Sequence, residues 1–172
     1  MKKERIGVFE TNSSSTHSIC IAKNAKLIIP SEIHFAFGEF GWEFRKLKSL
    51  ADKASYLYTG LMNNKMETEF QQVKKLLESK GIPVTYEERI VEHNCYHDQK
   101  GHFVQYESSP NEGYVDHSID LVPFLNAVLS DEESLMNFLF SGMSYIRTGN
   151  DNDDRSVKIN ETYPHDVYYK GN

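Results

Sequence analysis

The stretch Leu47-Lys-Ser-Leu-Ala-Asp-Lys-Ala-Ser-Tyr-Leu-Tyr-Thr-Gly-Leu61 decides the fold class, because its apolar residues recur at steps of three and four. This spacing places them on one side of a helix. A second run with the same period extends from Met66 to Leu77. Gly81 and Pro83 follow it, and both residues commonly mark the end of a helix. Residues 47–81 are therefore predicted to form two consecutive helices.

Short apolar runs on both sides of these helices predict strands. They cover residues 6–9, 18–21, 26–29, 33–37, 84–86, 102–106, 144–147, 156–159 and 166–169. Two more helices are predicted at 120–129 and 131–140, the second capped by Ser130 or Asp131 and closed by Gly142. The chain contains no internal repeat, linker or low-complexity tract. The predicted fold class is α/β or α+β, as a single domain over residues 1–172 with a mixed sheet and about four helices.

Composition and charge indicate the cellular compartment of the protein and the classes of partner that it can bind. Hydrophobic residues make up 39% of the chain and charged residues 26%, as in ordinary globular domains. The formal net charge of −6 disfavours a nucleic-acid partner, because binding to a phosphate backbone needs clustered Lys and Arg. No apolar run is long enough to span a membrane, and Met1-Lys-Lys-Glu-Arg5 does not resemble a secretion signal. With only Cys20 and Cys95, no disulfide scaffold is expected, and the prediction is a cytoplasmic protein without membrane association.

The most unusual passage is Glu10-Thr-Asn-Ser-Ser-Ser-Thr-His-Ser18, an uninterrupted polar run between two predicted strands. Short hydroxyl and amide side chains, together with backbone N–H groups, can wrap a phosphate in a concave loop. In this hypothesis the phosphate-binding residues are Asn12, Ser13, Ser14 and Ser15. His17 is the candidate catalytic acid or base, and Glu10 orients it or holds a metal. The alternative is a tight hairpin loop whose serines only satisfy one another.

The segment from Gly7 to Ser18, Gly-Val-Phe-Glu-Thr-Asn-Ser-Ser-Ser-Thr-His-Ser, resembles the opening of a group of uncharacterised phage and bacterial proteins. The later Tyr145-x-x-Thr-Gly-Asn-Asp-Asn152 is similar to a segment that such proteins carry. The resemblance is confined to these short segments. It implies a phage or prophage origin with the host cytoplasm as the setting, and it implies no activity.

A second polar segment, Arg147-Thr-Gly-Asn-Asp-Asn-Asp-Asp-Arg155, follows a predicted strand. Asp151 and Asp153 offer the oxygen ligands that suit Mg²⁺ or another divalent cation. Arg147 and Arg155 could grip a phosphate beside this metal. The pattern does not fit an EF-hand, because Arg155 replaces the required glycine and no amphipathic helices flank the segment. The alternative is a solvated acidic turn.

Two further passages have plainer interpretations. The histidine-bearing stretch from His93 to Gly101 contains only one compact half of a zinc site and is better explained as a polar hairpin loop. Trp42, between Phe40 and Phe44, is predicted to lie in the core rather than to stack on a base.

The preferred functional hypothesis joins the two polar segments at one edge of the sheet. Together they would bind a phosphorylated small molecule or nucleotide, with or without a divalent cation. The protein would then either hydrolyse or transfer the ligand at phosphorus or sequester it. The alternative, from a different class, is a phage accessory protein without catalytic activity. It would bind and inhibit a host protein through an acidic, Tyr-rich surface that includes residues 163–169.

Overall fold

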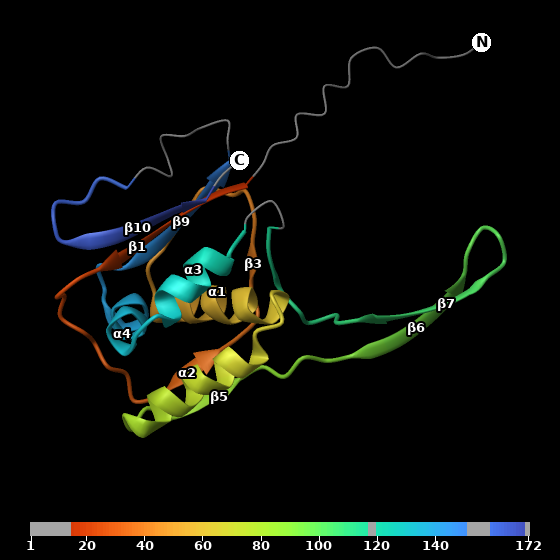
Figure 1. Cartoon of the computed structure of the whole chain (residues 1–172), viewed down its shortest axis with the longest axis horizontal. Coiled ribbons are helices and arrows are strands. Elements are labelled where there is room, and N and C mark those ends of the chain that lie inside the picture. Colours follow the sequence, from red (N-terminus) through yellow and green to blue (C-terminus); the bar gives the residue numbers. More distant parts are fainter. Residues whose placement is uncertain (1–14, 117–119, 151–158, 171–172) are drawn as a thin grey trace, which may run out of the picture.

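A four-stranded antiparallel sheet is the largest sheet among the described residues (Figure 1). The computed structural model describes residues 15–116, 120–150 and 159–170. The order in this sheet is β10 (His165–Lys170), β1 (Ser15–Ala22), β9 (Tyr145–Asn150) and β4 (Arg45–Leu47). Strands from the two ends of the chain therefore lie side by side, and every residue of β1 is buried.

Three helices lie on one side of this sheet (Figure 1). They are α1 (Leu50–Asn63), α3 (Val122–Leu129) and α4 (Glu132–Phe140), whereas α2 (Glu67–Ser79) lies on the far side of α1. Phe124 of α3 links the layers, because its ring centroid lies 5.5 Å from that of Phe138 in α4 and 6.2 Å from that of Tyr168 in β10. Edge-to-face ring pairs of this kind add to the gain from burying apolar surface.

α1 is the central helix of the body. On one side Tyr56 packs against Phe124, with 6.0 Å between ring centroids. On the other side Tyr58 packs against Phe70 of α2, with 4.7 Å between ring centroids. Because Tyr56, Leu57 and Tyr58 are all buried, α1 is covered on both sides rather than along the single stripe that its sequence predicts.

Ser49 caps the first turn of α1, where its hydroxyl accepts a hydrogen bond of 3.1 Å from the backbone N–H of Asp52. We expect Ser49→Ala to lower the free energy of unfolding by about 1 kcal/mol, because this N–H loses its acceptor. Ser49→Asn keeps an acceptor and should stay within about 0.5 kcal/mol of the native protein. Urea denaturation measures both values, and equal losses in the two variants would contradict the capping role.

Two short parallel strand pairs complete the body. β2 (Ile33–Phe35) pairs with β5 (Val84–Tyr86), and β3 (Glu39–Phe40) pairs with β8 (Tyr114–Val115). Gly113 approaches Gly38 so closely that a Cβ atom on Gly113 would lie 2.1 Å from the Gly38 carbonyl oxygen. Glycine is therefore required at position 113 for β8 to run beside β3.

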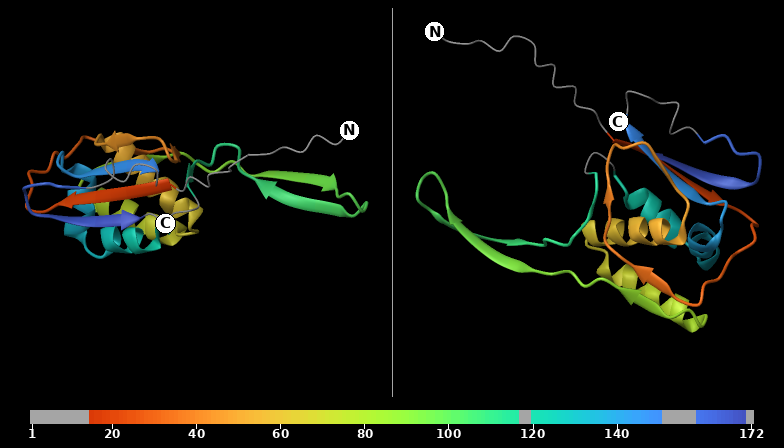
Figure 2. Two further views of the ribbon diagram at one scale, coloured as in Figure 1. Left: turned by 90° about the horizontal axis from the view of Figure 1, so that it is seen from above. Right: turned by 180° about the vertical axis from the view of Figure 1, so that it is seen from behind.

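The strands β6 (Glu92–His97) and β7 (Phe103–Ser108) form a hairpin that projects far from the body (Figure 1, Figure 2). Within the described chain these two strands pair only with each other. We call residues 92–108 the arm. At its tip, the Asp98 carboxylate accepts hydrogen bonds of 2.8 Å from the backbone N–H groups of Lys100 and His102. Gly101 adopts a positive φ of 83°, which completes the turn.

The predicted fold class is confirmed as α+β, with four helices among the described residues. The predicted helices at 66–77, 120–129 and 131–140 correspond to α2, α3 and α4. No single sheet of the described chain contains both parallel and antiparallel pairs. The four-stranded sheet is antiparallel throughout, whereas the pairs β2–β5 and β3–β8 are parallel. No described helix combines the length and the apolar character needed to cross a bilayer.

Several local predictions are wrong. The polar run was predicted as a loop as far as His17, but residues 15–17 belong to β1 and are buried. Residues 26–29 form no strand beyond a single bridge between Leu27 and Ser141. Trp42 is 53% exposed, because the chain bends there between β3 and β4. The predicted strand at 6–9 and most of the one at 156–159 lie outside the described residues.

Candidate functional site

The two polar segments predicted to form a site leave the central sheet at the same end. In the pairing of β1 with β9, Ser15 is the Cα partner of Asn150. Antiparallel pairing brings the start of one strand beside the end of the other. The described ends of the two segments are therefore adjacent, and Arg147 lies opposite Ser18 on the neighbouring strand.

Most of the predicted site residues lie outside the described part of the chain. These are Glu10, Asn12, Ser13, Ser14, Asp151, Asp153 and Arg155. Among the residues that are described, no three His, Cys, Asp or Glu side chains are arranged to hold a metal ion. Of the predicted site residues, the structure describes Ser15, His17 and Arg147.

Ser15 is engaged by a carboxylate from a distant part of the chain. Its hydroxyl donates a hydrogen bond of 2.5 Å to Oδ2 of Asp116, and the residue is fully buried. Asp116 is itself held by its backbone N–H, which donates to the Phe40 carbonyl at 2.9 Å. A negative charge beside the hydroxyl disfavours an anion at this position. Ser15 is therefore a poor ligand for a phosphate in this arrangement.

His17 lies on the face of β1 that is turned toward α1, and it is fully buried. Its Nε2 is 2.9 Å from the Gly41 carbonyl oxygen, and its Nδ1 is 2.8 Å from the Tyr56 hydroxyl. A carbonyl can only accept, so Nε2 carries the proton and the Tyr56 O–H donates to Nδ1. Both nitrogens of the ring are therefore occupied within the protein.

Burial lowers the pKa of His17 from 6.5 to about 4, although Gly41, Asp116 and Glu43 each act in the opposite direction. The imidazole is thus neutral at physiological pH. An acid or base in catalysis needs a nitrogen that can reach a substrate. In this geometry His17 joins the sheet to α1, and an acid–base role would first require one of its two hydrogen bonds to break.

The opposite face of the sheet carries a group of positive charges around one aromatic ring. Lys46 Nζ lies 3.7 Å from the centroid of the Tyr145 ring, Lys48 Nζ lies at 5.8 Å and Arg147 Cζ at 5.6 Å. We call these four residues the cationic face. Glu161 contacts it, because it accepts a hydrogen bond of 2.6 Å from the Tyr145 hydroxyl and lies 3.6 Å from Lys46 Nζ.

The charges of the cationic face repel one another. Burial lowers the pKa of Lys46, and the nearby charges of Lys48 and Arg147 lower it further. Such a group is more stable when an anion lies within reach.

Two hydroxyls of β1 belong to the same side of the sheet as the cationic face. Alternate residues of a strand face opposite sides, so Thr16 and Ser18 are turned away from the side that His17 faces. Both are buried, and neither hydroxyl oxygen has a hydrogen-bond partner in the described structure. A buried hydroxyl left in this state costs about 1–3 kcal/mol. Of the two residues, Ser18 is the one that lies directly opposite Arg147 of the cationic face.

The arm is a functional candidate that was not recognised from the sequence. Three aromatic side chains on it are unusually accessible: Tyr96 is 52% exposed, Phe103 58% and Tyr106 49%. The sequence predicts a loop at 93–101, whereas residues 92–97 form β6. The two-residue alternation of His93, Cys95 and His97 is a strand signal that could have revealed it.

Comparisons with family models, with curated proteins and with solved structures each find no match to this chain.

Proposed function

We propose that the protein is a binding protein that engages a partner protein through the arm. The observation that supports this proposal is the projecting two-stranded hairpin with three large aromatic side chains exposed to about half their surface. A two-stranded hairpin is only marginally stable in water by itself. A partner that covers the aromatic side chains would stabilise the hairpin and remove apolar surface from water.

Aromatic side chains lie on both faces of the arm. Tyr96 and Tyr106 contact each other with 5.9 Å between ring centroids, and the rings of His97 and Phe103 lie 5.5 Å apart. Cross-strand pairs of this kind stiffen a hairpin. Tyr and Phe are enriched at protein interfaces, and Tyr in particular dominates binding energy where it fills a pocket.

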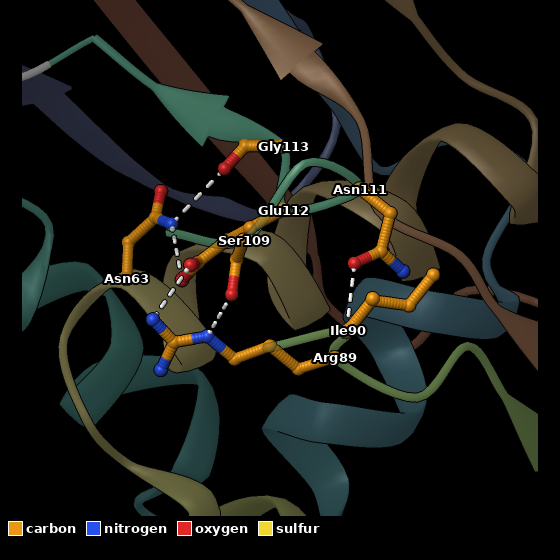
Figure 3. A network of polar contacts seen from close by, with 7 residues as sticks. All are labelled: Asn63, Arg89, Ile90, Ser109, Asn111, Glu112 and Gly113. Carbon is orange, nitrogen blue, oxygen red and sulfur yellow. Dashed lines mark hydrogen bonds and ion pairs between the residues drawn. The ribbon is translucent and has the colours of Figure 1, made fainter. Parts of the chain in front are cut away.

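The root of the arm is tied to the body by polar contacts (Figure 3). Arg89, just before β6, donates from Nε to the Ser109 hydroxyl at 2.6 Å and forms an ion pair with Glu112 at 3.0 Å. Asn63, at the end of α1, donates to the Gly113 carbonyl at 3.1 Å. These contacts join the two chain segments of the arm to each other and to α1. The arm is thus presented in a defined direction, which lowers the entropy cost of binding.

The charges of the arm indicate the chemistry of its partner. Glu92, Asp98 and Glu107 are acidic, and Lys100 is its only lysine or arginine. A nucleic acid would be repelled by this balance. The partner expected is a protein that offers apolar pockets surrounded by Lys and Arg side chains.

Substitutions on the arm test the proposal directly. We expect a tagged native chain to retain a specific protein from a bacterial lysate, and Tyr96→Ala combined with Phe103→Ala to weaken the affinity for that protein about 30-fold or more. Interferometry with the purified partner measures this affinity. Trp42→Ala is the matched control, because Trp42 is a comparably exposed aromatic residue, 53% exposed, that lies off the arm.

A second variant separates binding from folding. Residues 94–106 are replaced by Asn-Gly, which closes a short hairpin. Since the arm strands belong to no other sheet in the described chain, this variant should retain the thermal melting transition of the body. The proposal is wrong if the shortened protein still holds the partner with native affinity.

A further inference from the structure

We infer that the outer edge of β7 pairs with the same edge of a second copy of this chain, so that two arms form one four-stranded antiparallel sheet. The arm projects from the body, which leaves its long edges away from the helices and from the central sheet (Figure 1, Figure 2). The inference goes beyond the proposed function, because it concerns the backbone edge of the arm rather than its aromatic side chains and needs no other protein.

The backbone of β7 presents a row of hydrogen-bonding groups along its outer edge. At the tip of the arm the Asp98 N–H donates to the His102 carbonyl at 2.9 Å, so these two residues form a hydrogen-bonded pair. Hydrogen-bonded and non-hydrogen-bonded pairs alternate along an antiparallel hairpin. The outward-facing N–H and C=O groups of β7 are therefore those of Phe103, Gln105 and Glu107. Within the described chain no other strand pairs with this edge.

This edge lacks the features that commonly protect a strand from pairing with another chain, which are lysine, proline and the β-bulge. The sequence of β7, Phe-Val-Gln-Tyr-Glu-Ser, contains neither lysine nor proline. Its register with β6 is unbroken from Phe103 to Ser108, so no bulge twists the edge away. Two strands alone are only marginally stable, and further strands would stabilise the arm.

The sequence of β7 is complementary to itself when two copies run antiparallel. With a two-fold axis at Gln105, Phe103 lies opposite Glu107 of the second copy, and Gln105 lies opposite its own equivalent. Each outward-facing residue of β7 then meets an outward-facing residue. Val104 lies opposite Tyr106 of the second copy, and aliphatic–aromatic pairs of this kind stabilise sheets. Glu107 is the only charged residue of β7, so no like charges meet in this register.

The same pairing extends the aromatic surface of the arm across the two copies. Tyr96 of β6 is the Cα partner of Val104, and its ring contacts that of Tyr106. In the four-stranded sheet Val104 is flanked by Tyr96 of its own arm on one side and by Tyr106 of the second copy on the other. Covering these side chains removes apolar surface from water, which favours the dimer.

The edge of β6 is less suited to pair with itself. Because Cys95 is the Cα partner of Gln105, the equivalent two-fold axis would lie at Cys95. Glu92 would then lie opposite Asp98 of the second copy, and like charges directly opposite each other destabilise a sheet. The contact is therefore assigned to β7, as an isologous interface between two copies.

Sedimentation equilibrium of the purified full chain, with no other protein present, tests this inference. We expect a monomer–dimer equilibrium for the native protein. Gln105→Pro should weaken the dimer about tenfold or more, because it removes an outward-facing N–H from the pairing edge. The hydrogen bonds within the arm do not use this N–H and should persist. Cys95→Pro is the matched control, because it makes the same change at the opposite position on β6, and it should dimerise as the native protein does.

A crosslink locates the contact. With Cys95→Ser present, Gln105→Cys places two thiols beside the two-fold axis, and a short bismaleimide should join the two chains. In the native dimer the two Cys95 residues would lie three strand spacings apart, about 14 Å, which is too far for the same reagent. Cys20 is buried and should not react.

A native chain that stays monomeric at every concentration overturns the inference. Dimerisation of Gln105→Pro with native affinity overturns it as well, and so does a dimer that is weakened only in Cys95→Pro. Capture of a partner from a lysate by a chain that stays monomeric would support the proposed function while refuting this inference. A dimer that captures no partner would have the opposite meaning.

Discussion

Lys53→Met is expected to raise the free energy of unfolding at neutral pH and to lose this advantage as the pH rises. Lys53 lies in α1 with only 1% of its surface exposed, and its ammonium group donates a hydrogen bond of 2.7 Å to the Ser141 carbonyl. Burial lowers the pKa of Lys53 from 10.5 to about 8. A buried ammonium group without a carboxylate partner is costly, so the folded state favours the neutral amine.

The direction of the pH dependence follows from this lowered pKa. Between pH 8 and pH 10.5, the unfolded chain keeps a proton on Lys53 that the folded protein releases, so stability rises with pH. Below pH 8 Lys53 is charged in the folded protein, and burying this charge costs about 3 kcal/mol of the free energy of unfolding. Methionine has a similar length and no charge, but it removes the shorter of two hydrogen bonds to the Ser141 carbonyl, which keeps the one of 3.3 Å from the Ser144 N–H. We expect this loss to cost about 1–2 kcal/mol. The net gain expected at neutral pH is about 1–2 kcal/mol.

Urea denaturation at neutral pH and at about pH 9.5 measures this effect, and the difference between variant and native protein should fall by about 2 kcal/mol over that interval. Lys26→Met is the matched control, because the same substitution is made at an exposed lysine. Other groups that titrate in this range contribute equally to the native protein and to both variants. A Lys53→Met difference that stays constant with pH would show that Lys53 is charged and satisfied in the folded protein.

The elements that could be predicted from the sequence are those specified by local signals. For α4, a cap at Ser130 or Asp131 was predicted, and the structure has Asp131, whose carboxylate accepts a hydrogen bond of 2.7 Å from the Ser134 N–H. For α2, Gly81 was predicted to lie beyond the end of the helix, and it has a positive φ of 77°. Capping and termination depend on residues within one or two turns, so a single sequence contains the information.

The start of β1 could not be predicted, because two of its polar residues, Ser15 and His17, bond to distant parts of the chain. Ser15 bonds to Asp116, and His17 bonds to Tyr56 and to the Gly41 carbonyl. A run of Ser, Thr and His has the composition of a loop, and only these tertiary partners allow it to be buried in a strand. The same reason limits the prediction of the site. The described ends of the two polar segments lie side by side, with Ser15 opposite Asn150, but the surroundings of His17 are set by Tyr56 of α1 and by Gly41.

The arm was missed for the opposite reason. Its strands are stabilised by no core, so the apolar pattern that marks a buried strand is weak. In β6 each of His93, Cys95 and His97 is separated from the next by one residue, and none of the residues of this strand is buried. The side chains of an exposed strand therefore show no burial pattern from which the strand could be predicted.

His17 should make the protein sensitive to acid. Its pKa is lowered by burial from 6.5 to about 4, so the unfolded chain takes up a proton at a pH where the folded protein does not. The stability that the neutral imidazole provides is fully present above pH 6.5 and is lost as the pH falls toward 4. The expected loss is about 3 kcal/mol over this interval.

The His17→Gln variant isolates this contribution, because its amide can still donate to the Gly41 carbonyl but gains no proton in acid. Its free energy of unfolding should be lower than that of the native protein at neutral pH, since the fit against Tyr56 is imperfect. Between neutral pH and about pH 4, however, it should lose about 3 kcal/mol less than the native protein loses. His34→Gln, at an exposed histidine, should lose stability as steeply as the native protein. Parallel pH profiles for the native protein and His17→Gln would mean that His17 takes up its proton in the folded state, and an acid–base role for it would then regain support.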